Sequence, residues 1–273
     1  VQPQVDLTYS DVFLVPRRSA KSSRLDVELA PGDGTAATIP IVSSNMNSVT
    51  GPRLAAVLAR RGGLGVLPQD LPLQDLDAAI RWVKAQPTAW DTALVLGAEA
   101  TVAEARRMLP PAEGHGIVVG RSVDGVLRME DVTGVVAASR LPTALSDARL
   151  GDLVHARPIA IEAEDIRDGR AAFELIVAAD AELVLVVRRG EVIGTLSRRG
   201  ALRSTLYRPA VDASGRLHVA AAIGISGDVA AKARALAAAG VDVLVLDTAH
   251  GHQERMLQAL REGEKVTQID EGC

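Results

Sequence analysis

The chain has 273 residues, of which 48% are hydrophobic and 23% charged, and its formal net charge is −4 at pH 7. This length allows one large domain or two smaller ones, and the composition is typical of a globular protein with a sizeable core. Lysine and arginine are spread along the chain, and only 2% of the residues are aromatic. The sequence therefore lacks the basic patch and the stacking surface of a nucleic-acid-binding protein.

The apolar stretches are too interrupted to cross a membrane. The longest, residues 235–246, contains Gly240 and Asp242, whereas a spanning helix needs about 20 apolar residues. The N-terminus shows no basic-then-apolar secretion signal. The one cysteine, Cys273, cannot form an internal disulfide, which agrees with a reducing compartment. We expect a cytoplasmic protein without a membrane partner.

The first third of the chain predicts an alternation of strands and helices after a leading segment rich in turn residues. Residues 39–43 form a β-branched apolar run that predicts a strand buried on both faces. It runs into the polar side chains of Ser43, Ser44, Asn45 and Asn47. The elements predicted next are a helix at 54–61, stopped by Gly62-Gly63, a strand at 64–67 and a helix at 73–84.

From about residue 93 to 208 the pattern changes to two repeats. Each predicts a helix, then a pair of strands around a glycine-centred turn, then a helix. The first repeat has a helix at 101–109 and strands at 116–119 and 126–132, and the second has a helix at 169–179 and strand segments at 183–187 and 192–202.

After the repeats, strands are predicted at 218–223 and 242–246, with an alanine-rich helix at 227–239 between them, stopped by Gly240. Strand, helix and strand joined by short loops indicate parallel pairing. Only four such strands are predicted outside the repeats. Four strands leave open edges, so we expect either additional barrel strands beyond the four predicted or an unclosed sheet, and not a closed eight-stranded barrel built from these residues alone.

Three motifs in this order resemble the IMP dehydrogenase and GMP reductase family of purine-nucleotide oxidoreductases. They are Leu7-Thr-Tyr-Ser-Asp-Val-Phe-Leu-Val-Pro16, residues 39–52 with 61–67, and Val243-Leu-Val-Leu-Asp-Thr-Ala-His-Gly-His252. Residues 66–70 and 196–207 resemble the branch that keeps a pair of CBS repeats and acts as a GMP reductase.

The resemblance implies an α/β fold, a (β/α)8 TIM barrel of which about the first half is present, with an inserted tandem CBS domain. The implied parts are barrel residues 1–92, a regulatory CBS insert at 93–208, further barrel at 209–261 and an unassigned tail at 262–273.

Catalytic residues of such barrels sit at the carboxyl ends of strands. By resemblance, Ser44 and Met46 match positions that contact the purine nucleotide, and Asp247, Thr248 and Ala249 match positions beside the nicotinamide cofactor. From the residues alone, Ser44 and Asn45 could instead cap a helix and Met46 could fill the core. The three ordered motifs favour ligand contact for Ser44 and Met46.

Two further features bear on the chemistry. Gln69 stands where dehydrogenases of the family usually have a histidine near the cofactor adenine, which argues against a plain dehydrogenase. His250 and His252 flank a glycine but have no third ligand at suitable spacing, so no metal site is expected.

In CBS repeats, a Gly-apolar-apolar-Thr/Ser-x-x-Asp run ends the second strand, and its Asp accepts hydrogen bonds from ribose hydroxyls. Residues 125–131 keep Asp131 but lack the Thr/Ser, whereas residues 194–200 keep Ser197 but have Gly200 in place of the Asp. Asp131 and Ser197 are therefore the residues predicted to bind regulatory ATP or GTP. The alternative is that the repeats are structural and Asp131 caps the following helix.

The family's reaction implies a cysteine on a glycine-rich loop that attacks C2 of the purine. Here Cys273 follows Asp270-Glu-Gly, where carboxylates would raise its pKa, so we expect a bystander and leave the catalytic nucleophile unknown. The phosphate-binding loops are missing as well. The sequence is either a fragment of a longer enzyme or a chain that has lost catalysis.

The implied function is an NADPH-dependent GMP reductase that converts GMP to IMP and ammonia in purine salvage. The alternatives are an NAD-dependent IMP dehydrogenase and a non-catalytic nucleotide-sensing subunit. The resemblance also implies a homo-tetramer or octamer and a monovalent cation, K⁺.

Overall fold

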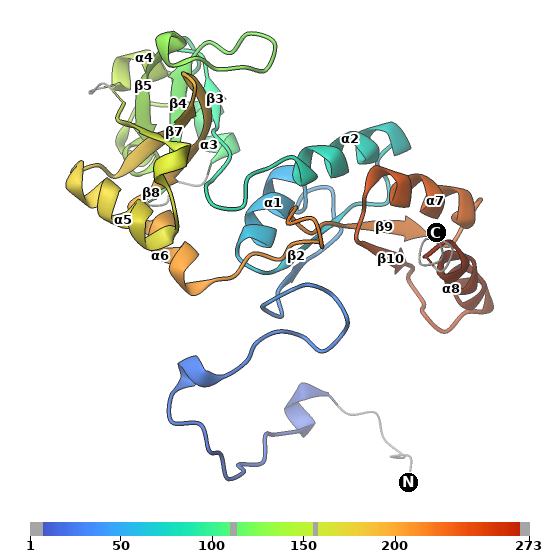
Figure 1. Cartoon of the computed structure of the whole chain (residues 1–273). Coiled ribbons are helices and arrows are strands. Elements are labelled where there is room, and N and C mark those ends of the chain that lie inside the picture. The colour runs from blue at the N-terminus through green and yellow to red at the C-terminus, as the bar shows by residue number, and fades with distance from the viewer. Residues whose placement is uncertain (1–7, 110–113, 155–157, 268–273) are drawn as a thin grey trace.

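The computed structural model describes residues 8–109, 114–154 and 158–267. One part of it is a parallel sheet with strand order β1-β2-β9-β10 (Figure 1). Its strands are β1 (Val42–Ser43), β2 (Leu64–Leu67), β9 (Ala220–Gly224) and β10 (Val243–Asp247). Its helices are α1 (Pro52–Arg60), α2 (Leu73–Lys84), α7 (Val229–Ala239) and α8 (Glu254–Thr267). We call this part the parallel-sheet unit.

The core of the parallel-sheet unit lies between the sheet and its helices. Leu67, Ala221 and Ile223 of the strands pack there with apolar side chains of α1, α2 and α7. Leu64, Val66 and the alternate alanines of β9 form a smaller cluster on the opposite face. Both faces of β2 and β9 are therefore apolar, as expected for strands inside a parallel sheet.

The ends of the predicted helices follow the local sequence closely. The helix predicted at 73–84 has these bounds in the structure. Gly62 (φ 90°) and Gly240 (φ 95°) adopt the left-handed conformation just after α1 and α7. A residue with a Cβ atom is strained in that conformation, which is why these two glycines end their helices.

The sheet is unclosed, as four strands predict, and it is consistent with part of a (β/α)8 barrel. The prediction of a buried strand at 39–43 was wrong in two respects. Only Val42 and Ser43 are in β1, and Ile41 and Val42 are 54% and 61% exposed. β1 pairs only with β2, so its apolar side chains have no second neighbour to cover them.

The described residues between 93 and 208 form two similar three-stranded sheets, which we call the repeat unit. Their strand orders are β3-β4-β5 and β6-β7-β8, and in each the first pair is parallel and the second antiparallel. The strands are β3 (Val95–Leu96), β4 (Gly116–Gly120), β5 (Val132–Ala137), β6 (Ala160–Glu162), β7 (Leu183–Arg188) and β8 (Glu191–Ser197). The helices are α3 (Val102–Met108), α4 (Leu150–Leu153), α5 (Gly169–Ala178) and α6 (Arg198–Leu206). Val118 of β4 and Leu185 of β7 belong to one apolar cluster, which joins the two sheets.

The structure corrects the predicted strands of the repeats. The second strand of the first repeat is β5 at 132–137, not 126–132, and the segment predicted at 192–202 divides into β8 and α6. Asp131 ends a 3-10 turn (Met129–Asp131) and is followed directly by β5. Asp131 therefore does not cap a helix, and the alternative interpretation of this residue was wrong.

The strand register also shows which residues of the two repeats are equivalent. Gly116 pairs with Ala137 in the first repeat, and Leu183 pairs with Ser197 in the second. Ala137 is thus the counterpart of Ser197. Asp131 lies at the other end of its hairpin, so the two candidate nucleotide residues do not occupy equivalent positions.

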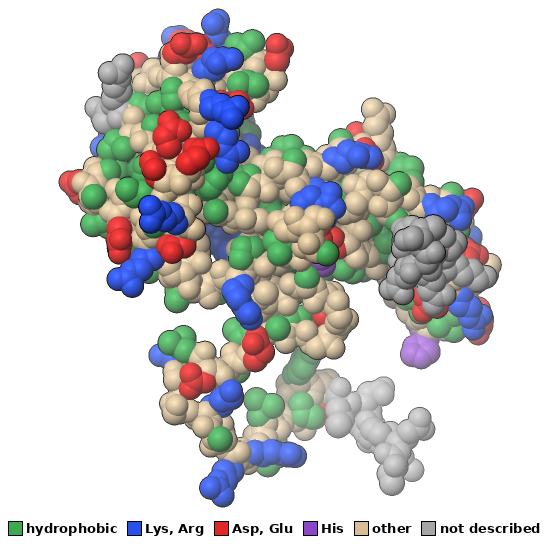
Figure 2. Space-filling view, in the orientation of Figure 1, with side chains coloured by type: hydrophobic (Ala, Val, Ile, Leu, Met, Phe, Trp, Pro, Cys, Tyr) green, Lys and Arg blue, Asp and Glu red, His purple; other side chains and the backbone are tan. Residues whose placement is uncertain are grey.

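Residues 8–36 extend away from both units, with two 3-10 turns at Tyr9–Asp11 and Arg24–Asp26. Figure 2 shows their hydrophobic side chains uncovered. Phe13 and Leu14, for example, are 86% and 97% exposed. Among the described residues, no helix has both the length and the apolar composition that a membrane crossing requires.

Candidate functional site

The carboxyl ends of the parallel strands bring three polar side chains together. The carboxylate of Asp247, at the end of β10, accepts two hydrogen bonds on the same oxygen, Oδ2. Asn45 Nδ2 donates one at 2.7 Å from the turn after β1, and Gln69 Nε2 donates the other at 3.0 Å from the loop after β2. The backbone carbonyl of Gln69 accepts a hydrogen bond from Lys232 Nζ at 2.9 Å. Three strand ends are thereby tied to one carboxylate.

This arrangement leaves the Asp247 carboxylate suited to a hydroxyl donor. The two amides fix its orientation, and no hydrogen bond from the described residues reaches Oδ1. A carboxylate oxygen of this kind accepts hydrogen bonds from ribose hydroxyls. The residues present therefore fit a nucleotide ribose. Sequence reasoning singled out Asp247 but gave Asn45 no contact with it, because the two residues are 202 positions apart.

The turn after β1 exposes the two residues predicted to bind substrate. The buried Thr50 hydroxyl bonds both Ser43 Oγ and the Ser44 carbonyl, which holds the turn closed. Ser44 is exposed and Met46 is 56% exposed. Gly51 is the N-cap of α1. The helix-cap alternative for Ser44 and Asn45 and the core-filler alternative for Met46 were therefore wrong, whereas ligand binding stays a prediction.

The remaining predicted residues lie on or beyond the loop after β10. Thr248 is partly buried, and its hydroxyl accepts from Gln253 Nε2 at 2.7 Å, whereas Ala249 is exposed. His250 and His252 are exposed. In the part of the chain that the structure describes, no three His, Cys, Asp or Glu side chains converge as metal ligands. Cys273 lies outside the described residues.

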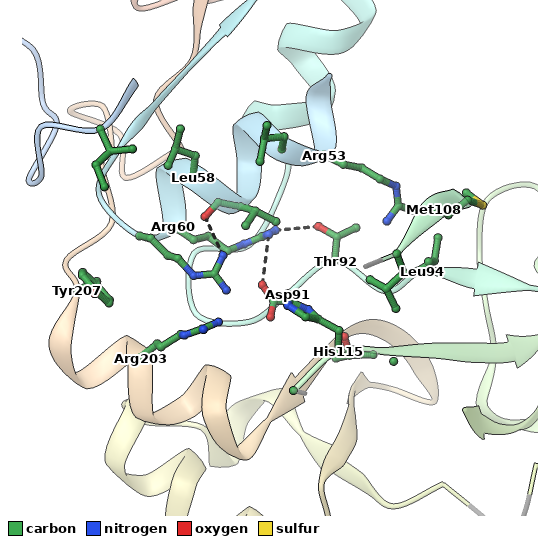
Figure 3. Close-up of a pocket in the computed structure, with 18 of the residues that line it drawn as sticks. Arg53, Leu58, Arg60, Asp91, Thr92, Leu94, Met108, His115, Arg203 and Tyr207 are labelled. Carbon is green, nitrogen blue, oxygen red and sulfur yellow. Dashed lines mark hydrogen bonds and ion pairs between the residues drawn. The ribbon is translucent and has the colours of Figure 1, made fainter. Parts of the chain in front are cut away.

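A cavity of about 940 Å³ lies between α1 of the parallel-sheet unit and the repeat unit (Figure 3). Its polar lining comprises Arg53, Arg60, Arg61, Asp91, Thr92, His115, Thr195 and Arg203. Leu54, Val57, Leu58, Met108, Leu109 and Tyr207 are among its apolar and aromatic lining residues. The sequence analysis did not identify this cavity, because segments around residues 55, 92, 115 and 203 form it only in the folded chain.

Ser197 and Asp131, the predicted regulatory residues, are placed differently from this cavity. Ser197 Oγ accepts from Gly200 N at 2.9 Å and so caps α6, the helix that carries Arg203 and leads to Tyr207. Gly114, which lines the cavity, lies beside Ser197. Asp131 is not among the lining residues.

Comparisons with known proteins agree with this fold. Residues 6–270 match the model of the IMP dehydrogenase / GMP reductase domain. The GMP reductase of Mycobacterium tuberculosis is 43% identical over 265 residues, which are 95% of this chain and 52% of that protein. The GMP reductase of Leishmania major is 31% identical over 283 residues, which are 97% of this chain and 56% of that protein.

A solved structure gives the same result. The GMP reductase from Trypanosoma brucei in complex with guanosine 5'-triphosphate has a TM-score of 0.54 and 25% identity, over 95% of this chain and 63% of that one. This chain spans about half the length of the curated relatives it matches. From these matches and the sheet that underlies them, the chain belongs to the IMP dehydrogenase / GMP reductase domain family.

Proposed function

We propose that the chain is part of an NADPH-dependent GMP reductase. The single observation that carries this proposal is the 43% identity, over 95% of this chain, to a protein named GMP reductase. In the proposed reaction, the C2 amino group of GMP takes up a proton and leaves as ammonia, and a hydride takes its place to give IMP. NADPH, when bound, supplies that hydride and is released as NADP⁺.

The described residues would serve binding and orientation in this reaction. Asp247 would accept hydrogen bonds from the cofactor ribose while Asn45 and Gln69 hold its carboxylate in place. Thr248 and Ala249 would flank the same cofactor. Ser44 and Met46, exposed on the neighbouring turn, would contact the purine nucleotide. Held geometry of this kind lowers the entropic part of a reaction barrier.

The repeat unit would be the regulatory part. Two similar sheets that face each other are what a pair of CBS repeats forms, and such pairs bind adenine or guanine nucleotides. We therefore propose a CBS insert at 93–208 between barrel segments 1–92 and 209–261, with ATP or GTP as ligands and with Ser197 and Asp131 among the contacts. A homo-tetramer or octamer and a bound K⁺ complete the proposal by family resemblance.

The cofactor role is tested by Asp247→Ala in the full-length protein. Loss of a charged hydrogen-bond partner should lower kcat/KM for NADPH by about 10- to 100-fold. The matched control is Asp228→Asn, because Asp228 Oδ1 only caps α7 through Ala231 N at 2.8 Å and asparagine caps equally well. Unchanged kinetics in Asp247→Ala, with circular dichroism unchanged, would remove this residue from the cofactor site.

The direction of the reaction is tested with the full-length wild type. GMP-dependent oxidation of NADPH with release of ammonia supports the reductase. Formation of XMP from IMP and NAD would instead identify an IMP dehydrogenase. A folded protein that binds nucleotides but catalyses neither reaction would be a nucleotide-sensing subunit.

A further inference from the structure

The turn that follows β1 is held closed by hydrogen bonds among its own residues. Val49 N and Thr50 N both donate to the Met46 carbonyl, at 2.8 and 2.9 Å. Thr50 is 1% exposed, and its hydroxyl bonds both Ser43 Oγ, at 2.9 Å, and the Ser44 carbonyl. The segment therefore behaves as one piece, and a displacement of any part of the turn moves the rest with it.

Within this turn, one partly buried side chain lies between two exposed ones. Ser44 is exposed and Met46 is 56% exposed, whereas Asn45 is partly buried. Asn45 Nδ2 donates to Asp247 Oδ2 at 2.7 Å. Among the described residues of the turn, Asn45 is the one whose side chain hydrogen-bonds Asp247. The residues proposed to contact the purine nucleotide are thus the immediate neighbours of a residue that touches the candidate cofactor carboxylate.

The sheet itself ties this turn to β10 only indirectly. β1 is two residues long and pairs with β2 alone. β10 pairs with β9 along its whole length, so Asp247 lies opposite Gly224 in a continuous ladder. In the strand order β1-β2-β9-β10, β1 and β10 are the two outer strands and do not pair. The Asn45–Asp247 bond therefore connects two strands that the backbone hydrogen bonds of the sheet leave apart.

On its other side, the Asp247 carboxylate is held by a side chain that is itself fixed. Gln69 Nε2 donates to the same oxygen, Oδ2, at 3.0 Å. Gln69 lies against the backbone of Gly224, where a Cβ atom would be 2.6 Å from Gln69 Oε1, and Lys232 Nζ holds the Gln69 backbone carbonyl. Because Gln69 belongs to the loop after β2, its bond orients the carboxylate without linking it to the turn after β1.

We propose that the Asn45–Asp247 hydrogen bond couples the binding of the purine nucleotide to the binding of the nicotinamide cofactor, with Asn45 as the positioning residue that links the two sites. This inference rests on the proposed reductase function. A nucleotide that contacts Ser44 and Met46 fixes the turn, and a ribose hydroxyl on Asp247 Oδ1 fixes the carboxylate. Each ligand favours the arrangement in which the bond is made, so the first to bind leaves less for the second to order.

The coupling is measured by calorimetry on the full-length protein with GMP and NADP⁺, a pair that cannot undergo the reduction because NADP⁺ carries no hydride. The coupling ratio is the Kd of NADP⁺ alone divided by its Kd in saturating GMP. The wild type should give a ratio of about five or more, and the same ratio when GMP is titrated with and without NADP⁺, since coupling is reciprocal.

Two substitutions at Asn45 remove the link in different ways. Asn45→Ala takes away the donor and should bring the ratio to about one. Asn45→Asp keeps the size of the side chain but sets a second carboxylate against Asp247, so repulsion replaces the hydrogen bond and the ratio should again fall to about one. Circular dichroism establishes that each variant is folded.

Two controls separate the link from other effects. Asn47→Ala makes the same change at an exposed position of the same turn and should keep the wild-type ratio. Gln69→Ala removes the other donor to Asp247 Oδ2 and should weaken NADP⁺ binding but keep the ratio. If Gln69→Ala abolished the ratio as Asn45→Ala does, the orientation of the carboxylate, not its link to the turn, would carry the coupling.

The remaining outcomes distinguish this inference from the proposed function. A wild type that binds GMP and NADP⁺ independently, with a ratio of about one, would overturn the coupling and leave the reductase standing. A weaker Kd for GMP alone in Asn45→Ala, with the ratio retained, would make Asn45 a direct contact of the substrate instead of a link. A folded wild type that binds neither ligand would reject the proposed function together with the coupling.

Discussion

Lys84 lies at the end of α2 with its ammonium group between two carboxylates. Nζ donates to Asp212 Oδ2 at 3.0 Å and to Asp242 Oδ1 at 2.6 Å, and the three side chains are 5%, 14% and 11% exposed. Asp242 also accepts from Val219 N at 2.8 Å, just before β9. This network joins α2 to the starts of β9 and β10. The two segments it links are separated in sequence by the whole repeat unit.

Lys84→Met should destabilise the chain strongly. It removes the cation that two largely buried carboxylates share, and although Asp212 keeps its ion pair with Arg216, we expect a loss of about 3 kcal/mol. The control is Arg81→Met on the same helix, whose exposed pair with Asp77 is worth about 0.3–0.5 kcal/mol. Urea unfolding followed by circular dichroism measures both. Equal losses in the two variants would contradict the structural role of the buried network.

The pH dependence of this loss follows from Asp212. Burial alone would raise the pKa of Asp212, but hydrogen bonds from the Arg216 backbone and from Lys84 outweigh it and hold that pKa below its ordinary value. The stability from a lowered carboxylate pKa is present above the unfolded pKa, about 3.9, and is lost as the pH falls through the folded value. The difference in the free energy of unfolding between wild type and Lys84→Met should therefore be largest at neutral pH, and it should decrease as the pH falls below about 4.

At the scale of elements, the contact of β2 with α1 depends on a residue without a side chain. A Cβ atom on Gly65 would lie 2.5 Å from the Ala55 Cα and 2.6 Å from its Cβ. Ala55, Ala56 and Ala59 are fully buried on the same helix face. Small residues on both elements let the helix backbone approach the strand, and this approach sets the position of α1 at the cavity.

Gly65→Ala should destabilise the protein by about 1–3 kcal/mol through overpacking. Gly263→Ala on α8 is the control, and it should stabilise the protein rather than destabilise it. Its added Cβ meets nothing within 4 Å, and alanine is a better helix former by up to about 1 kcal/mol. Thermal unfolding of both variants measures these changes in stability. A Gly65→Ala variant that unfolds at the wild-type temperature would show that α1 can move away from β2 without loss of stability.

At the scale of the whole molecule, the repeat unit interrupts the parallel-sheet unit at two points that lie close together. Asp91 N donates to the Thr195 carbonyl at 2.9 Å, and Ala210 N donates to the Ala59 carbonyl at 2.8 Å. The side chains of Lys84 and Asp212, outside the repeat unit, are in contact. A short linker can therefore replace residues 93–208 without separating the strands that flank them.

Excision of residues 93–208 from the full-length protein should leave the proposed GMP reductase activity close to its basal rate and abolish the proposed response to ATP and GTP. The matched comparison is Asp131→Ala in the intact protein, which should keep basal activity and weaken the response. Initial rates with and without nucleotide test this. Loss of basal activity in a folded excision variant would mean that the repeat unit contributes to the active site.

The sequence by itself determined the elements whose signals are local. The bounds of α2 and β2, the ends of α1 and α7, and the open sheet of four parallel strands follow from apolar periodicity and from glycines that accept positive φ. Asp247 was placed at a strand end for the same reason. Burial patterns repeat every few residues along the chain, so they can be recognised in the sequence before the fold is known.

Only the tertiary structure decided the rest. β3 and β6 are two and three residues long and exist as strands because β4 and β7 pair with them. β5 begins six residues later than predicted. The residues just before it contact the other repeat instead, where Met129 N donates to the Gly190 carbonyl. The Asn45–Asp247 bond and the arginine-lined cavity join residues far apart in sequence, and such contacts form only when packing brings the elements together.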